Sequence, residues 1–170
     1  MRGVRFAIVL GILLQLLVGC SQAASSPGDE QTAEQYVKAH DYKVTASKGK
    51  VDSFTLDKSK LIGGTDSLGL DALKVQQIWG VQTEEPDTYF GKEITVYGFV
   101  VSNHPLEKIY KVNTSVFVMV CEGDVIGAFA APDAQMFGSV YSFAGETLEE
   151  VTGLSYDAWR TQWLKKYGGS

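Results

Sequence analysis

Histidine and cysteine are scarce in this chain, which has two of each among its 170 residues. A zinc site takes three or four ligands from histidine, cysteine or carboxylate side chains. Neither an HExxH motif nor a pair of closely spaced cysteines occurs in the sequence. We therefore expect no metal centre, no cofactor and no disulfide framework.

The motifs of common catalytic machineries are also missing. The chain has neither a GxSxG nucleophile motif nor a GxxxxGK[ST] phosphate loop. Acidic residues gather at 84–87 and 146–150, where they indicate solvated charge and a helix start rather than the facing carboxylates of a glycosidase. We expect no catalytic residue. An envelope enzyme whose site is assembled from scattered residues, with His104 as first candidate, is the alternative.

The chain also lacks an excess of positive charge and an apolar run long enough to span a membrane. The formal net charge is −5, whereas a nucleic-acid-binding surface needs a basic face, so no nucleic-acid partner is expected. The apolar stretch at residues 6–17 is shorter than the roughly 20 residues of a transmembrane helix. Because Arg2 and Arg5 precede it, this stretch indicates a secretory signal peptide.

The signal segment ends in LVGC, residues 17–20. This ending resembles the lipobox of bacterial lipoproteins, in which the cysteine is diacylglycerylated and the chain is cut just before it. The resemblance implies cleavage between Gly19 and Cys20, lipid attachment at Cys20, and a place on the extracytoplasmic face of the cell membrane, or at the outer membrane in a Gram-negative cell. Two acyl chains make a stable anchor. The alternative is an ordinary signal peptide followed by a chance cysteine.

The chain then divides into three parts. Residues 1–19 form the predicted signal peptide, and residues 20–31, which are small, polar and include Pro27 and Gly28, form a lipidated flexible tether. Residues 32–170 form a single α+β domain. Lysines outnumber acidic residues at 38–60, which indicates either a solvated face or contact with an anionic leaflet.

Periodicity predicts the elements of this domain. Thr32 and Gln35 have capping-box spacing and start a helix, and residues 42–46 and 51–56 are strand-like around a turn, which predicts a hairpin. Residues 67–79 predict a helix. Strands are expected at 93–102, 115–121, 125–131 and, at an edge, 139–143. Thr147 starts a helix that stops near Gly153, and Ser155 caps a last helix over residues 156–167.

The predicted fold is α+β: a mostly antiparallel sheet covered by helices, with the C-terminal helix packed on it. Strand 115–121 is apolar on both faces, so both faces need a cover, either helices or a sheet curled into a small OB-like barrel. The run YFGKEITVYGFVV is similar to an opening strand of such a barrel. Cys121 is expected to be buried, as is the helical stripe Tyr156, Trp159, Trp163 and Tyr167. At Gly127 a packed helix or a ligand should approach closely.

The runs AEQYVKAHDYKVTASKGKVDSFTL and IWGVQTEEPDTYFGKEITVYGFVVSNHPLEKIY, with SVFVMVCEGDVIGAFAAPD further on, resemble small uncharacterised lipoproteins of Gram-positive bacteria. That resemblance implies no activity. We expect a non-enzymatic binding module of the cell envelope, anchored to the membrane by lipid, with a protein, peptide or envelope component as partner. A structural or assembly lipoprotein is the other alternative. Asn103 and His104, in a turn after a strand, are candidate ligand-binding residues.

Overall fold

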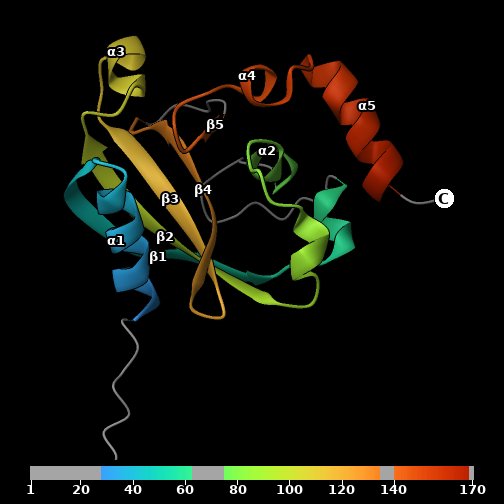
Figure 1. Ribbon diagram of the computed structural model, residues 1–170, viewed down its shortest axis with the longest axis horizontal. Helices are drawn as coiled ribbons and strands as arrows, with labels where there is room; N and C mark the ends of the chain where they lie inside the picture. Colours follow the sequence, from blue (N-terminus) through green and yellow to red (C-terminus); the bar gives the residue numbers. More distant parts are fainter. Residues whose placement is uncertain (1–27, 63–74, 135–139, 169–170) are drawn as a thin grey trace, which may run out of the picture.

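The centre of the fold is an open antiparallel sheet whose strands follow one another in space as in sequence (Figure 1). The computed structural model describes residues 28–62, 75–134 and 140–168. The strands are β1 (Lys43–Thr55), β2 (Glu93–Ser102), β3 (Thr114–Cys121), β4 (Asp124–Pro132) and β5 (Tyr141–Ser142). This sheet with its helices confirms the α+β prediction. Because β1 and β5 are two separate edges, the sheet does not close into the OB-like barrel that was the alternative.

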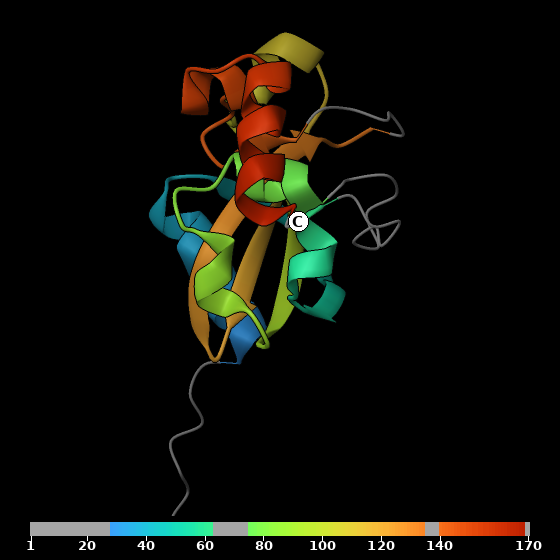
Figure 2. The ribbon, with the colours of Figure 1, turned by 90° about the vertical axis from the view of Figure 1, so that its right-hand side faces the viewer.

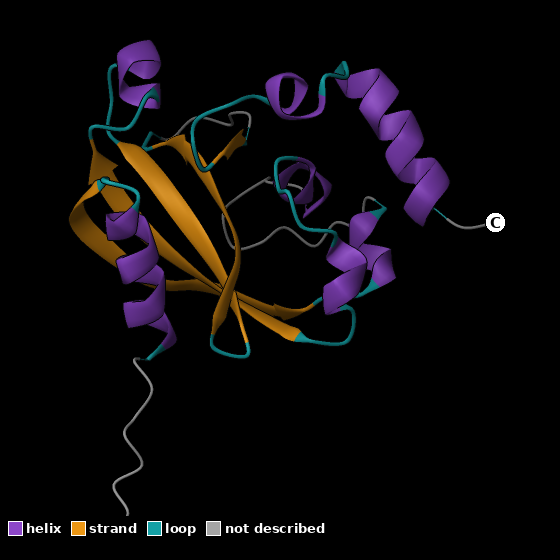
Figure 3. Cartoon of the chain, in the orientation of Figure 1, coloured by secondary structure: helices purple, strands orange, loops and turns teal. Residues whose placement is uncertain are grey.

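Helices lie on both faces of this sheet (Figure 3). They are α1 (Asp29–Ala39), α2 (Val75–Gly80), α3 (Leu106–Tyr110), α4 (Leu148–Thr152) and α5 (Tyr156–Tyr167), with the 3₁₀ turns η1 (Lys58–Leu61) and η2 (Pro86–Tyr89). α1 covers one face, and α2 and α5 lie over the other, with α5 in front of the strands in Figure 2.

The core therefore consists of two apolar layers that share β3. Every residue of β3 is buried. Val116 and Val118 face α1 and contact the cluster of Ala33 and Val37, whereas Phe117 and Met119 belong to the cluster that contains the tryptophans of α2 and α5. The expectation that this strand is covered on both faces is confirmed, and so is the buried position of Cys121.

The predicted hairpin at 42–56 is wrong, because β1 is one strand paired with β2 along its whole length. Its register shifts three times, and one shift lies between Ser47 and Gly49. Gly49 has φ +66°, and its N–H donates to the Ser47 hydroxyl at 2.9 Å. The turn-forming residues thus make a bulge instead of a chain reversal.

The first helix begins earlier than predicted. α1 starts at Asp29, and the Gly28 carbonyl accepts hydrogen bonds from the backbone N–H groups of Gln31 and Thr32. The capping box expected at Thr32 is therefore absent, since this residue already lies inside the helix. The last three residues of the predicted tether, 29–31, belong to α1, where Asp29 and Glu30 suit the helix dipole.

The C-terminal elements agree with the sequence. Thr147 and Glu150 form the predicted capping box of α4, and Gly153 ends that helix with φ +70°. Ser155 caps α5, which spans the expected residues. Three members of the aromatic stripe are buried, but Tyr156 is 42% exposed. Strands β2, β3 and β4 also match their predicted positions within one residue at each end.

The close approach expected at Gly127 comes from a side chain of this protein. A Cβ at Gly127 would lie 2.6 Å from Oε1 of Gln82 and 2.7 Å from Cε of Met119. Gln82 follows α2, so a residue beyond the helix, and not the helix itself, makes this approach. Ile126 lies in a bulge that turns it to the face opposite Ala128, although residues two apart in a regular strand share a face.

Several predictions concern residues outside the described part of the chain. These are the signal peptide, the lipobox with Gly19 and Cys20, the tether up to residue 27, and the helix at 67–79 as far as residue 74. The described end of that helix, α2, buries Val75, Ile78 and Trp79.

Candidate ligand cleft between α2 and α5

One wall of the candidate site is the aromatic face of α5. Trp159, Trp163 and Tyr167 recur every four residues and therefore lie on one helical face. Their rings contact in series, with centroids 5.1 Å and 4.5 Å apart. The Trp163 indole N–H donates to the Leu61 carbonyl at 2.6 Å, which fixes α5 to η1.

The opposite wall is the end of α2 and the segment that follows it. A Cβ at Gly80 would lie 2.7 Å from Cζ2 of Trp159 and 2.8 Å from Leu148, so glycine permits the close approach of α2 to α5 and α4. Gln82 then fixes the next turn, because its amide donates to the Ile78 carbonyl at 2.9 Å and accepts from the Ala128 N–H at 3.0 Å.

Between these walls lies a cleft of about 230 Å³. Drug-sized ligand pockets hold about 300–1,000 Å³, so the cleft suits a group no larger than one sugar ring or one side chain. All three tryptophans of the chain line it. Polar side chains of both walls complete the lining: Gln82, Thr83, Glu84, Glu85, Thr152, Gln162 and Lys166.

An ion pair lines the cleft. The Glu85 carboxylate accepts hydrogen bonds from Lys166 Nζ at 2.6 Å and from the Tyr167 hydroxyl at 2.8 Å. The Lys166 hydrogen bond and then the Tyr167 hydrogen bond lower the pKa of Glu85, while burial and the bond to Glu85 raise the pKa of Tyr167 to about 12. Glu85 is therefore ionised at neutral pH, with its Oε2 already engaged, and offers no general base.

His104, the first sequence candidate, is not among the residues that line this cleft and is 1% exposed. The Leu106 N–H donates to its Nδ1 at 3.2 Å, and its Nε2 lies 3.1 Å from the Phe143 carbonyl. Nδ1 is thus the acceptor, and Nε2 carries the proton. Burial lowers the pKa of His104, against the opposing effects of the Phe143 carbonyl and Glu107. Neither ring nitrogen is free for a ligand.

Asn103, the second candidate, joins two turns. Its φ is +66°, a conformation that asparagine tolerates better than most residues. Its amide donates to the Asp41 carbonyl at 2.8 Å, and its side-chain oxygen accepts from the Lys43 N–H at 3.1 Å. The structure therefore gives Asn103 a role in holding the start of β1 against the end of β2.

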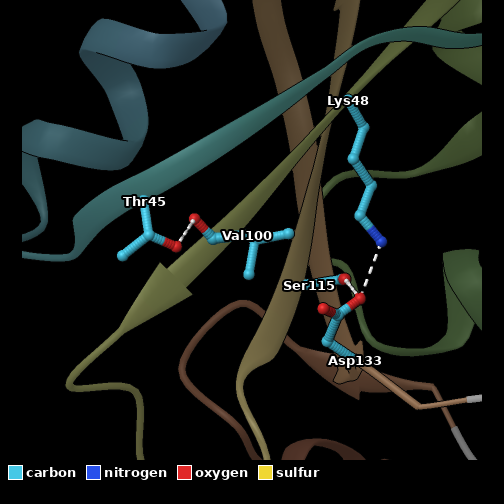
Figure 4. Close-up of polar contacts among 5 residues, drawn as sticks. All are labelled: Thr45, Lys48, Val100, Ser115 and Asp133. Carbon is cyan, nitrogen blue, oxygen red and sulfur yellow. Dashed lines mark hydrogen bonds and ion pairs between the residues drawn. The ribbon is translucent and has the colours of Figure 1, made fainter.

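A serine, a carboxylate and a lysine do converge at one place (Figure 4). The Ser115 hydroxyl and Lys48 Nζ lie 2.7 Å and 2.8 Å from the same oxygen of Asp133. Burial raises the pKa of Asp133, but the hydrogen bonds from Lys48 and Ser115 outweigh it and lower the pKa. Ser115 is 2% exposed, so a substrate cannot reach it. The cluster links β1 to β3 and to Asp133, the residue after β4. β2 lies between β1 and β3, and its Gly98 leaves room for the Lys48 side chain.

We expect Asp133→Ala to lower the free energy of unfolding by about 1–3 kcal/mol, because it leaves the buried Ser115 hydroxyl without an acceptor. Lys48→Met keeps the apolar stem and removes only a partly exposed ion pair, so it should cost about 0–1 kcal/mol. Urea unfolding of both variants measures the difference. Equal losses would show that the ion pair, and not Ser115, is the stabilising contact.

Further candidates are limited in the described ranges. They contain no group of three or more histidine, cysteine or acidic residues placed to hold a metal ion. None of their helices has the length and apolar character needed to cross a bilayer. Burial, followed by the charge of Glu122, raises the pKa of Cys121, so the thiol of this residue is not activated.

Sequence reasoning missed the cleft, because it treated the stripe on α5 only as core. The sequence carries no signal for the second wall of the cleft. The segment after α2 has the composition of a loop, and its position against α5 depends on tertiary contacts. In comparisons with known proteins, no family model, no curated protein and no solved structure matches this chain.

Proposed function

We propose that the protein is a lipid-anchored extracytoplasmic binding module of the cell envelope and that its ligand occupies the cleft between α2 and α5. The observation that carries the binding role is this cleft, lined by three tryptophans and by amide, hydroxyl and charged groups. Aromatic side chains beside polar groups that fix orientation are typical of small-ligand sites, and here more than half of the lining residues are polar. The lipobox-like LVGC segment supports the anchor.

The side chains of the cleft favour binding over catalysis. Thr83 and Gln162 offer donors and acceptors to a polar ligand, whereas the Gln82 amide is already bonded to backbone groups. The indole rings of Trp159 and Trp163, 7% and 8% exposed, offer a small apolar contact. No histidine or cysteine lies among the lining residues in the described part of the chain. A hydrolytic reaction needs an activated nucleophile with an adjacent base, and Glu85 is already held by Lys166 and Tyr167.

We expect Cys20→Ala to move the protein from the membrane fraction to a soluble one or to leave it as an unprocessed precursor. Two acyl chains supply the attachment, at about 0.8 kcal/mol for each buried methylene. Fractionation with mass spectrometry of the N-terminal peptide measures the outcome. Cys121→Ala is the matched control and should leave fractionation unchanged. A Cys20→Ala protein that is processed and still membrane-bound would contradict the anchor.

The cleft itself can be tested with tryptophan fluorescence, because every tryptophan of the chain lines it. Soluble muropeptides from digested bacterial cell wall are the probe, since they combine single sugar rings with short peptides. We expect a saturable change in emission that weakens at least tenfold in a Thr83→Ala, Gln162→Ala variant, which removes polar lining without touching the core. Arg160→Ala, on the same helix but outside the cleft, should bind as the parent does.

If muropeptides leave the emission unchanged in the parent protein, this ligand class is excluded. If the double variant and Arg160→Ala bind equally, the ligand lies elsewhere. A protein that is anchored but binds no envelope fragment would favour the structural or assembly lipoprotein over the binding module.

A further inference from the structure

The short helix α3 forms a tip that projects from one end of the domain (Figures 1 and 2). Leu106 and Tyr110, four residues apart, turn inward, Leu106 being fully buried, so Lys108 and Ile109 turn outward. Ile109 is 66% exposed and Val112, just beyond the helix, is 37% exposed. They are two of the four large hydrophobic residues exposed in the described part of the chain.

The scaffold holds this tip rigidly, although a five-residue helix is not stable alone. His104 accepts the Leu106 N–H, and Glu107 accepts the Asn103 N–H at 3.2 Å. The Tyr110 and Tyr141 hydroxyls share a short hydrogen bond. The outward exposure of Ile109 is therefore a fixed feature of the fold and not a result of fraying.

Lysines are the sequence neighbours of the exposed apolar residues. Lys108 and Lys111 flank Ile109, and Lys43 lies beside Asn103, to which its backbone N–H donates. None of the three ammonium groups makes an ion pair within the described residues. Glu107 in α3 and Asp41 beside Asn103 lie at the same end, so three lysines face two carboxylates and the local excess is one positive charge, on a chain with net charge −5. The four residues Lys108, Ile109, Lys111 and Val112 are called the α3 tip below.

The geometry points to an anionic lipid surface as the partner of the α3 tip. Peripheral membrane contact combines two features. Apolar side chains enter the membrane–water interface, and neighbouring lysines pair with anionic headgroups. A specific protein interface buries about 800 Å² on each partner, which two isolated aliphatic side chains do not provide. A lipid surface needs no such area.

The arrangement of the chain permits this contact on the membrane that would hold Cys20. α3 lies at the opposite end of the domain from the start of α1 in both views. α1 spans about 16 Å, and the residues from 21 to 28 reach up to about 28 Å when extended. The domain can therefore lie along the bilayer, attached at both ends. The inference itself does not require the lipid anchor.

The test uses the full chain purified from membranes and mixed with vesicles of phosphatidylcholine alone or with 30% phosphatidylglycerol, a proportion of about one anionic lipid in three. An Ile109→Cys variant carries an environment-sensitive fluorophore, vesicles contain a lipid quencher, and Tyr156→Cys on α5 is the matched control. The parent chain, labelled in parallel, is the blank. We expect quenching at position 109 only with anionic vesicles, and none at position 156.

The charge requirement is tested with Lys108→Gln and Lys111→Gln. Each should shift the equilibrium of the tip away from the membrane about fivefold, and the pair about 25-fold. Lys58→Gln with Lys165→Gln makes the same change in net charge at exposed positions elsewhere and should change quenching less than about twofold.

Four combinations of flotation and quenching distinguish lipid contact by the α3 tip from lipid anchoring at Cys20. Flotation with both vesicles and quenching at 109 only with anionic lipid supports both. Flotation only with anionic vesicles, with quenching at 109, supports the tip and contradicts the anchor. Flotation with both vesicles and no quenching at 109 supports the anchor and overturns the tip. Flotation with neither contradicts both.

Discussion

Replacing Trp163 by alanine is expected to lower the free energy of unfolding by about 3–5 kcal/mol, as truncation of a large buried aromatic residue usually does. The side chain is 8% exposed and belongs to the larger apolar cluster. Its removal leaves a cavity between α5 and the sheet side of the core, and it leaves the Leu61 carbonyl without its indole donor. Urea unfolding followed by circular dichroism measures the loss.

Two further variants identify the origin of this loss. Trp163→Phe keeps a ring in place and removes the indole N–H, so it should cost about 1–3 kcal/mol. Tyr156→Ala, on the same helix but 42% exposed, should cost less than about 1 kcal/mol. If Trp163→Ala were no worse than Tyr156→Ala, α5 would not be packed as described, and the cleft would lose one wall.

Acid should destabilise the protein through His104. Burial lowers the pKa of this side chain in the folded state, whereas the unfolded chain has the ordinary histidine value of about 6.5. Below that pH the unfolded state therefore binds more protons than the folded state, and stability falls as the pH falls. The decline reaches at most about 1.4 kcal/mol per pH unit and ends below the folded-state pKa. Above pH 6.5 this contribution is constant.

The structural reason is that protonation of Nδ1 would place a second N–H against the Leu106 N–H that it now accepts. Unfolding curves collected between pH 8 and about 5.5, where carboxylates of ordinary pKa stay almost fully ionised, measure the slope. His104→Gln should be less stable at pH 8 but should lose the slope, and His40→Gln, at the exposed end of α1, should keep it. An unchanged slope in His104→Gln would assign the acid sensitivity to another group.

The elements that follow from sequence are those whose local signals and tertiary contacts agree. Strands β2 to β4 are β-branched and aromatic, and α5 has both a Ser155 cap and a four-residue aromatic repeat, so pattern and packing indicate the same structure. Region 42–56 differs, because Ser47 and Gly49 are suited to both a turn and a bulge. Pairing with β2 decides between them, and that contact is remote in sequence.

The candidate site shows the same limit more strongly. The aromatic repeat on α5 is visible in the sequence, but the position of Gly80 against Trp159 is not. Polar loop residues often bind ligands, which makes His104 and Asn103 candidates from the sequence. In the structure, their side chains instead form hydrogen bonds with backbone groups of this chain. Such local bonding is decided by the turn conformation, which a single sequence does not reveal.

The irregular pairing of β1 also bears on whether copies of this protein aggregate through their sheet edges at high concentration. An outer strand of a sheet invites another chain to add to it, and long straight ones are routes to fibres. β1 breaks its register three times and bears lysines at 43, 48 and 50, while the opposite border, β5, has two residues. Register breaks, lysines and very short outer strands are features that work against such addition, so we expect β1 to be a poor template for a second molecule when copies are crowded together.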